Sequence, residues 1–176
     1  QRYAPEIRTP IIRRQVREAS VTREGHITVY LPAYGAQALL AVLGQIPELR
    51  WEVFSRHWDM PTIKGNVRFL PASSDGFLKS MASSNGVLCG AGFETPSEAL
   101  FLGKPLLVVP MKGQFEQQCN ASALAQMGVT TMPEFEPHCV DTLRTWLHES
   151  KTVAVEYPDE SREVLVQALE SKNAAV

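Results

Sequence analysis

Apolar residues follow two different spacings along the chain from residue 26 onward. Short runs rich in Val, Ile and Leu are typical of strands, whereas apolar residues three or four positions apart are typical of helices. The strand pattern occurs at residues 26–31, 51–54, 67–70, 86–89 and 105–110. The helix pattern occurs at residues 37–43, 75–82, 96–102, 114–127, 140–147 and 159–171. Alternating strands and helices predict a parallel sheet, because parallel strands need crossover connections that are usually helical.

The predicted fold is therefore α/β: a Rossmann-like, doubly wound parallel sheet of about six strands with helices on both faces. The run from Pro105 to Pro110 shows no polar alternation, which predicts a central strand that is buried on both faces. Residues 114–127 and 159–171 each predict a helix with one apolar stripe. The two stripes comprise Phe115, Cys119, Ala123, Leu124 and Met127, and Val164, Leu165, Ala168 and Leu169. Ligands of such sheets bind beyond the carboxyl ends of the strands, so the loops after the strands are the places to look for a site.

The composition narrows the class of protein. A chain of 176 residues fits one compact domain. Its 17 basic and 19 acidic residues leave no cationic excess, which argues against nucleic acid as a partner. Three cysteines without close spacing indicate neither a disulfide framework nor a zinc site, and they suit a reducing cytoplasm. No apolar run approaches the ~20 residues of a membrane span and no leader resembles a secretory signal, so we expect a cytoplasmic protein without a membrane span.

The first 24 residues are rich in Arg and lack the alternating pattern of the rest. Pro5 and Pro10 disfavour a continuous helix there. We interpret residues 1–24 as a linker with one short helix that follows further protein, and the alternative is a frayed terminus. Residues 25–150 are expected to form the ligand-binding domain, and residues 151–176 a tail with a final helix.

The loop after the predicted strand 86–89 carries the strongest chemical signal. It passes Gly90 and Gly92 and then enters a predicted helix. Glycines let a backbone approach an anion closely, and the free amides and positive dipole end of a helix start favour negative charge. A diphosphate is the group that suits this loop best.

A purely architectural interpretation competes with this one. Thr95 and Glu98 have the spacing of a capping box, and Pro96 suits the first position of a helix. Capping boxes are common, so the helix signals alone favour the architectural alternative. The rest of the loop has to distinguish the two interpretations.

Two further loops carry weaker signals. Glu116, Gln117 and Asn120 follow the predicted strand 105–110, and the first and last of them share a face at the start of a helix, where they suit a polyhydroxylated ligand. Alternatively, Glu116 complements the helix dipole and the amide side chains are simply solvated. The loop after the first predicted strand places Gly35 for close approach to a ligand, although it lacks the three-glycine fingerprint of a dinucleotide site.

Together, residues 90–120 resemble the donor-binding signature of glycosyltransferases of the GT-B fold. The pattern is most similar to the family 28 branch, which includes the bacterial GlcNAc transferase of peptidoglycan synthesis, and to uncharacterised bacterial and archaeal relatives. The resemblance extends from His26 to His148, and the first loop departs from the Gly-Gly-Ser type. The shared features, in order, are the Gly-rich turn, Thr95, Glu98-Ala99, Gly103, Pro105, Pro110, Glu116-Gln117 and Asn120.

The resemblance implies a role in donor binding for ten residues. Gly35 and the amides of Gly92, Phe93, Glu94 and Thr95 would hold the diphosphate, Glu98 the ribose hydroxyls, and Glu116, Gln117 and Asn120 the donor sugar. Leu70 marks the place of the nucleobase, for which uracil is expected by analogy.

The same resemblance implies a hexosyltransferase that uses a UDP-sugar without a metal or another cofactor. Such enzymes stabilise the departing diphosphate with helix dipoles and side chains, and the sequence has no Asp-x-Asp cluster that would chelate a divalent cation. The acceptor site and general base would lie in a missing N-terminal acceptor domain or a separate subunit. We therefore expect an inactive fragment, assign no catalytic residue, and allow for peripheral membrane association of the full-length protein.

Two other functions remain open at this point. The chain can be a non-catalytic module that binds a sugar nucleotide, or one half of a sugar-nucleotide 2-epimerase. An epimerase needs catalytic carboxylates and a histidine from both domains around one ligand, whereas transfer needs a distinct acceptor.

Overall fold

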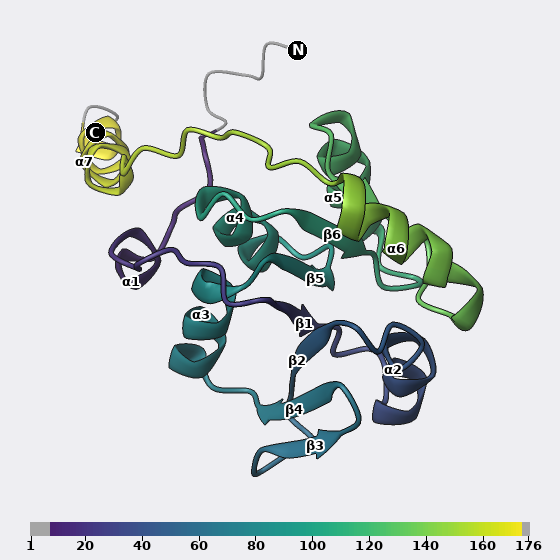
Figure 1. The fold of residues 1–176 in the computed structure, drawn as a ribbon. Coiled ribbons are helices and arrows are strands. Elements are labelled where there is room, and N and C mark those ends of the chain that lie inside the picture. The colour runs from purple at the N-terminus through teal and green to yellow at the C-terminus, as the bar shows by residue number, and fades with distance from the viewer. Residues whose placement is uncertain (1–7, 174–176) are drawn as a thin grey trace.

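The structure, a computed structural model, describes residues 8–173 and contains one seven-stranded sheet (Figure 1). The strand order is β3-β4-β2-β1-β5-β6-β7. Neighbouring strands run parallel, except that β3 pairs antiparallel with β4. The strands are β1 (His26–Tyr30), β2 (Arg50–Ser55), β3 (Thr62–Lys64), β4 (Val67–Pro71), β5 (Gly86–Gly90), β6 (Leu106–Val109) and β7 (Thr130–Thr131).

Helices cover both faces of the sheet, as the doubly wound pattern predicts (Figure 1). One hydrophobic core joins the sheet to α2 and α6, and a second core on the opposite face joins it to α1, α3, α4 and α5. The helices are α1 (Arg14–Arg17), α2 (Ala36–Leu43), α3 (Ser74–Ser83), α4 (Glu94–Phe101), α5 (Phe115–Gln126), the 3₁₀ turn η1 (Pro137–Cys139), α6 (Val140–Glu149) and α7 (Ser161–Asn173). The predicted fold class is therefore confirmed, with two short strands, β3 and β7, added at the sheet edges.

The strand β6 is buried on both faces, but its predicted central position is wrong. Leu107 and Val109 face one core, and Leu106 and Val108 face the other. In the sheet, however, β6 lies next to the two-residue edge strand β7, and β1 occupies the middle. A continuous apolar run indicates that both faces of a strand are covered by helices, and here the helices cover the sheet almost to its edge.

The predicted inward face of α5 is wrong for four of its five residues. Phe115 is 79% exposed and Met127 is 44% exposed, and Cys119 and Ala123 are exposed as well; Leu124 of the predicted stripe is buried, together with Ala121. The helix is rotated because its amide side chains, including Asn120, face the sheet edge and bond to backbone there. In α7, similarly, two residues of the predicted stripe, Leu165 and Leu169, are each 64% exposed.

The segment before β1 is packed on the domain rather than frayed. Ile12 and Val16 are buried in the core on the α3 and α4 side. The buried Lys104 ammonium donates a hydrogen bond of 2.7 Å to the carbonyl of Thr22, which fixes the second half of the segment. The part of the linker prediction that concerns residues 1–7 lies outside the described residues.

Candidate functional site

The turn between β5 and α4 lies at the carboxyl edge of the sheet and leaves open space in front of it. Gly92 does not adopt a left-handed φ, and a Cβ at this position would meet no atom within 4 Å. The fold itself therefore does not require glycine here, which leaves room for a ligand against the backbone. The N-cap of α4, Phe93, makes no side-chain capping bond, so the first amides of the helix keep their hydrogen-bonding capacity.

The capping box that the sequence allowed is not formed. The helix α4 begins at Glu94, so Thr95 lies inside it rather than at the N-cap. The Glu98 carboxylate instead accepts two hydrogen bonds from the guanidinium of Arg13, with Nε–Oε1 at 2.6 Å and Nη2–Oε2 at 2.9 Å. A capping box is therefore excluded as the role of Glu98, whose carboxylate pairs with Arg13 and lines a cleft.

A cleft of about 220 Å³ opens beside the amino end of α4. Glu94, Thr95 and Glu98 contribute to its lining, and so do the cations Arg13 and Arg56. The Glu98 side chain is only 5% exposed, whereas that of Arg13 is 45% exposed. Its hydrogen bond to Glu98, together with the charges of Glu98 and Glu94, raises the pKa of Arg13 above its ordinary value. The two carboxylates of the cleft are thus balanced by two permanent positive charges.

Aromatic side chains form the apolar part of this cleft. The Phe77 ring of α3 lies between two others, 5.4 Å from Tyr30 of β1 and 5.2 Å from Phe54 of β2, measured between centroids. Residues 72–74, which follow β4, complete the lining. Such a surface suits a flat aromatic group such as a nucleobase. These residues come from separate elements, so no motif in the sequence joins them; the signal available was that Tyr30 and Phe54 lie at the ends of predicted strands.

The start of α5, which follows β6, contacts the Gly-rich turn at residues 90–92. The amide nitrogen of Asn120 donates a hydrogen bond of 3.1 Å to the carbonyl of Ala91. The Oε1 atom of Gln117 accepts a hydrogen bond of 3.0 Å from the backbone of Met111 and lies 3.5 Å from the ideal Cβ position of Gly90. Both side chains therefore lie at the Gly-rich turn. Neither of them lines the cleft of Glu98.

Glu116 and the loop after β1 lie at the same carboxyl edge of the sheet, because β6 and β1 flank β5. Glu116 is exposed, with Oε1 3.5 Å from the Asn120 amide nitrogen. Gly35 is the N-cap of α2, and a Cβ there would also meet open space. Its neighbour Tyr34 accepts a hydrogen bond of 3.1 Å from the Phe135 backbone, and burial raises the pKa of the Tyr34 phenol. The loop is thereby held in place at the carboxyl end of β1.

Leu70 lies in a neighbouring groove and not in the cleft of Glu98. This groove, about 360 Å³, runs between α3 and the sheet. Phe54 and Ser73 line both hollows, so the two adjoin. Ala72, two residues after Leu70, does line the cleft. The loop that follows β4 therefore reaches the candidate site, while the Leu70 side chain points elsewhere.

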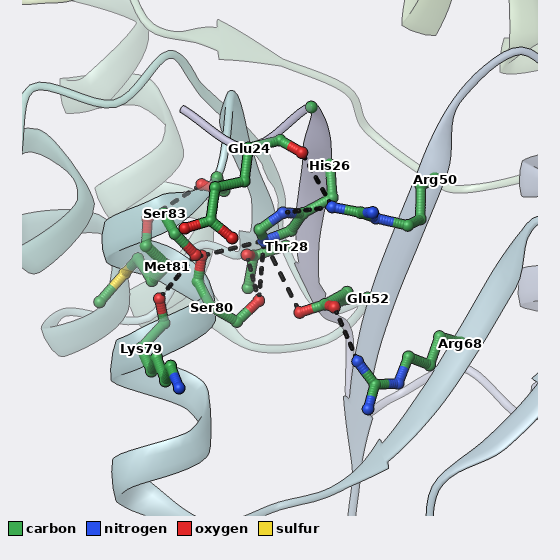
Figure 2. A network of polar contacts seen from close by, with 12 residues as sticks. Glu24, His26, Thr28, Arg50, Glu52, Arg68, Lys79, Ser80, Met81 and Ser83 are labelled. Carbon is green, nitrogen blue, oxygen red and sulfur yellow. Dashed lines mark hydrogen bonds and ion pairs between the residues drawn. The ribbon is translucent and has the colours of Figure 1, made fainter. Parts of the chain in front are cut away.

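A polar network fills the floor of this neighbouring groove (Figure 2). His26 is 2% exposed, and its Nε2 lies 3.1 Å from the carbonyl of Ser80 and 3.6 Å from Glu52. Glu52 in turn pairs with Arg68 at 3.2 Å. Each of these groups has a partner within the network, and the network thereby links β1, β2 and β4 to α3. His26 is thus a packing residue.

Within residues 8–173, no three His, Cys, Asp or Glu side chains gather as metal ligands would. None of the helices in that same range combines the length and the hydropathy that crossing a bilayer demands. The expectation that the reaction needs no metal remains a prediction.

Comparison with known proteins gives the geometry a context. Residues 3–148 match the family model described as Glycosyl transferase family 1. One relative is the UDP-N-acetylglucosamine–N-acetylmuramyl-(pentapeptide) pyrophosphoryl-undecaprenol N-acetylglucosamine transferase of Pseudomonas fluorescens. It is 30% identical over an alignment of 144 positions that covers 73% of this chain and 40% of that protein. The same enzyme of a second strain is 31% identical over an alignment of 137 positions that covers 69% of this chain and 38% of that protein. The chain thus spans about two fifths of the length of these curated relatives.

Solved structures share the fold at low sequence identity. Spinosyn rhamnosyltransferase SpnG aligns with a TM-score of 0.57 at 22% identity, over 74% of this chain and 39% of that one. Phytolacca americana UGT2, complexed with UDP-2fluoro-glucose and pterostilbene, aligns with a TM-score of 0.56 at 18% identity, over 92% and 45%. The solution structure of ALG13 aligns with a TM-score of 0.53 at 17% identity, over 81% of this chain and 95% of that one.

The sheet and its helices are accordingly those of a GT-B glycosyltransferase domain. The chain itself belongs to glycosyl transferase family 1 and is homologous to the peptidoglycan GlcNAc transferase. The resemblance inferred from the signature between residues 90 and 120 is confirmed.

Proposed function

We propose that this chain is the donor-binding, C-terminal domain of a hexosyltransferase and that it holds a UDP-sugar at the carboxyl edge of its sheet. The observation that carries the proposal is the uncapped amino end of α4, which opens beside Gly92 onto a cleft lined by the Glu98 carboxylate. An amide-rich positive end and an adjacent carboxylate suit a ligand that joins a diphosphate to a hydroxylated ribose. The curated relatives act on UDP-N-acetylglucosamine according to their names, which supports a UDP-sugar as donor.

The diphosphate is assigned to the turn and the first turn of α4. The backbone amides of Gly92, Phe93, Glu94 and Thr95 are the donors nearest the uncapped helix end. Gly35 faces open space at the same sheet edge, where the loop after β1 covers the far side of the phosphates. Charge that develops on the departing diphosphate is stabilised by these fixed dipoles, so we infer that transfer needs no metal.

The ribose is assigned to Glu98. A carboxylate has about four lone-pair sites, and Arg13 occupies one on each oxygen. One site on each oxygen remains for the two adjacent hydroxyls of a ribose. The nucleobase then extends over Phe54 and Phe77 toward the loop after β4, where we retain the neighbourhood of Leu70 as its place.

The donor sugar is assigned to the start of α5. Gln117 and Asn120 lie against the Gly-rich turn, and Glu116 is exposed beside them. Their amide and carboxylate groups offer both donors and acceptors, which is what the hydroxyls of a hexose require. A sugar attached to a diphosphate at Gly92 projects toward these side chains.

We infer that the acceptor site and the general base lie on a second domain or subunit. The cleft on this chain provides groups for a donor, and His26, the buried histidine, is engaged in the network beside α3. This domain alone is therefore expected to bind the sugar nucleotide without transferring the sugar. A cytoplasmic location, with peripheral contact to a membrane in the full-length protein, fits a donor of this kind.

Calorimetric titration of the chain with UDP and UDP-N-acetylglucosamine tests the proposal. Saturable one-to-one binding of both, with competition between them, is the expected result. Absence of binding at millimolar ligand would contradict it. For a version of the protein that includes the preceding domain, we expect UDP release only when an acceptor is present; release of an epimerised sugar instead would favour an epimerase.

A further inference from the structure

The Arg13 side chain comes from the segment before the sheet, yet it reaches the candidate ribose-binding carboxylate. Arg13 and Glu98 are separated by 85 positions in sequence, and no local pattern links them. Their contact is a two-bond fork, the arrangement in which a guanidinium fixes both the position and the plane of a carboxylate. The pair therefore sets how Glu98 faces the cleft.

The backbone of Arg13 is itself held by the core. Ile12 on one side and Val16 on the other are 3% and 0% exposed. Arg13 is the N-cap of α1, and its carbonyl accepts hydrogen bonds of 3.0 Å from Val16 and 3.1 Å from Arg17. The guanidinium is therefore presented from an anchored segment, which makes the fork preorganised before a ligand arrives.

Charge gives the pair a second effect. Glu98 and Glu94 both line the cleft, and a diphosphate brought beside them adds further negative charge. Like charges at short range oppose binding. Arg13 offsets the Glu98 charge at 2.6 Å while leaving lone pairs on the carboxylate free. An acidic side chain can thus serve as a hydroxyl acceptor next to an anion.

We propose that Arg13 is a positioning residue for the nucleotide: it orients the Glu98 carboxylate so that the 2′ and 3′ hydroxyls of a ribose can donate to it. This inference rests on the proposed function, because it takes Glu98 as the ribose contact. Arg13 acts through Glu98, and the signature of that action is discrimination between ribose and deoxyribose.

The test compares UDP with 2′-deoxy-UDP by calorimetry on the wild type, Arg13→Lys and Arg13→Met. One hydrogen bond from a hydroxyl to a carboxylate corresponds to about a 10- to 100-fold preference, so the wild type should favour UDP by at least tenfold. Arg13→Lys keeps the charge but loses the fork, and its preference should fall to about twofold or less. Arg13→Met should lose the preference and also bind both ligands more weakly, because an uncompensated carboxylate then faces the diphosphate.

Arg14→Lys is the matched control. Arg14 is the next residue, its side chain is 87% exposed, and it pairs with Glu18 at 2.7 Å on the surface. This variant should retain the wild-type preference. A thermal unfolding scan of each variant shows that it is folded at the temperature of the titration.

The outcomes separate this inference from the proposed function. A wild type that does not bind UDP would overturn the proposed function, and this inference with it. If the wild type binds UDP and 2′-deoxy-UDP equally, the ribose does not bind to Glu98. That result would overturn the inference but not the proposed binding of the diphosphate. A preserved preference in Arg13→Lys would overturn the positioning role alone. Tighter UDP binding in that variant would overturn it too, because it would show that the Arg13–Glu98 pair competes with the ribose for the carboxylate.

Discussion

Replacing Glu98 with Gln separates ligand binding from structure at the central carboxylate. The amide has nearly the same shape, but it carries no charge and one of its two ends becomes a donor. Two hydroxyl bonds to a carboxylate contribute about 1.5–3 kcal/mol each, and bonds to a neutral amide contribute about 1 kcal/mol or less. The expected loss of binding free energy is about 2–3 kcal/mol, or roughly 30- to 150-fold in the Kd of UDP.

The stability of Glu98→Gln should change much less. The substitution removes no capping bond, because the N-cap of α4 is Phe93 and makes none with its side chain. The Arg13 side chain is 45% exposed, so water replaces much of the broken ion pair, and we expect a loss of about 1 kcal/mol in the free energy of unfolding.

Calorimetry with UDP and urea unfolding on the same preparation measure both quantities. Glu18→Gln is the control, because it breaks the exposed ion pair with Arg14 on the same segment. Unchanged UDP affinity together with a stability loss above about 2 kcal/mol would refute the reasoning and make Glu98 a structural residue.

Three further variants test other parts of the account. Gln117→Ala should weaken binding of UDP-N-acetylglucosamine more than binding of UDP, and equal losses would remove the sugar contact. Gly92→Ala should leave the free energy of unfolding the same or raise it by up to about 1 kcal/mol, because the added Cβ meets no neighbour. The same variant should lower the affinity for UDP at least about tenfold, and unaltered affinity would place the diphosphate elsewhere. Burial lowers the pKa of Lys104 from 10.5 to about 8. Between these two pH values the unfolded chain therefore binds more protons than the folded chain, so Lys104 should make the free energy of unfolding rise with pH across that range. Urea unfolding at pH 7.5 and 10 should show this rise in the wild type and not in Lys104→Met; the same slope in both proteins would assign it to other groups.

Strong periodic patterns predicted most of the fold, and weak or non-local signals account for what was missed. The apolar runs of β1, β5 and β6 are buried on both faces, and their buried residues match the runs in the sequence. The strands β3 and β7 have three and two residues, which is too short for any period to appear. Their position follows from hydrogen bonds to β4 and β6.

The errors in α5 have a specific cause. Apolar spacing placed Phe115 and Met127 inward, but polar bonding decided the rotation of the helix. Hydrogen bonds from Asn120 to Ala91 and from the Met111 backbone to Gln117 turn the amide face toward the sheet edge. A helix whose polar residues face inward is the kind of local conflict that marks a functional site.

The candidate site was predictable where its residues share a loop and not where they meet across the fold. The Gly-rich turn and Glu98 lie in one short stretch, so their spacing carried the information. Arg13 joins Glu98 only after the N-terminal segment has packed beside α4, and Arg56 arrives from the end of β2. Contacts of this kind depend on the order of strands, which the local sequence does not encode.

The central claim is that a nucleoside diphosphate binds at the amino end of α4. Backbone amide shifts of the isotope-labelled chain, recorded by NMR during titration with UDP, test it most directly. The account predicts saturable shifts concentrated at Gly92–Thr95 and Glu98. Shifts concentrated instead at the opposite end of the sheet, around the cavity that Ile46 and Trp146 line, or no shifts at all, would contradict it.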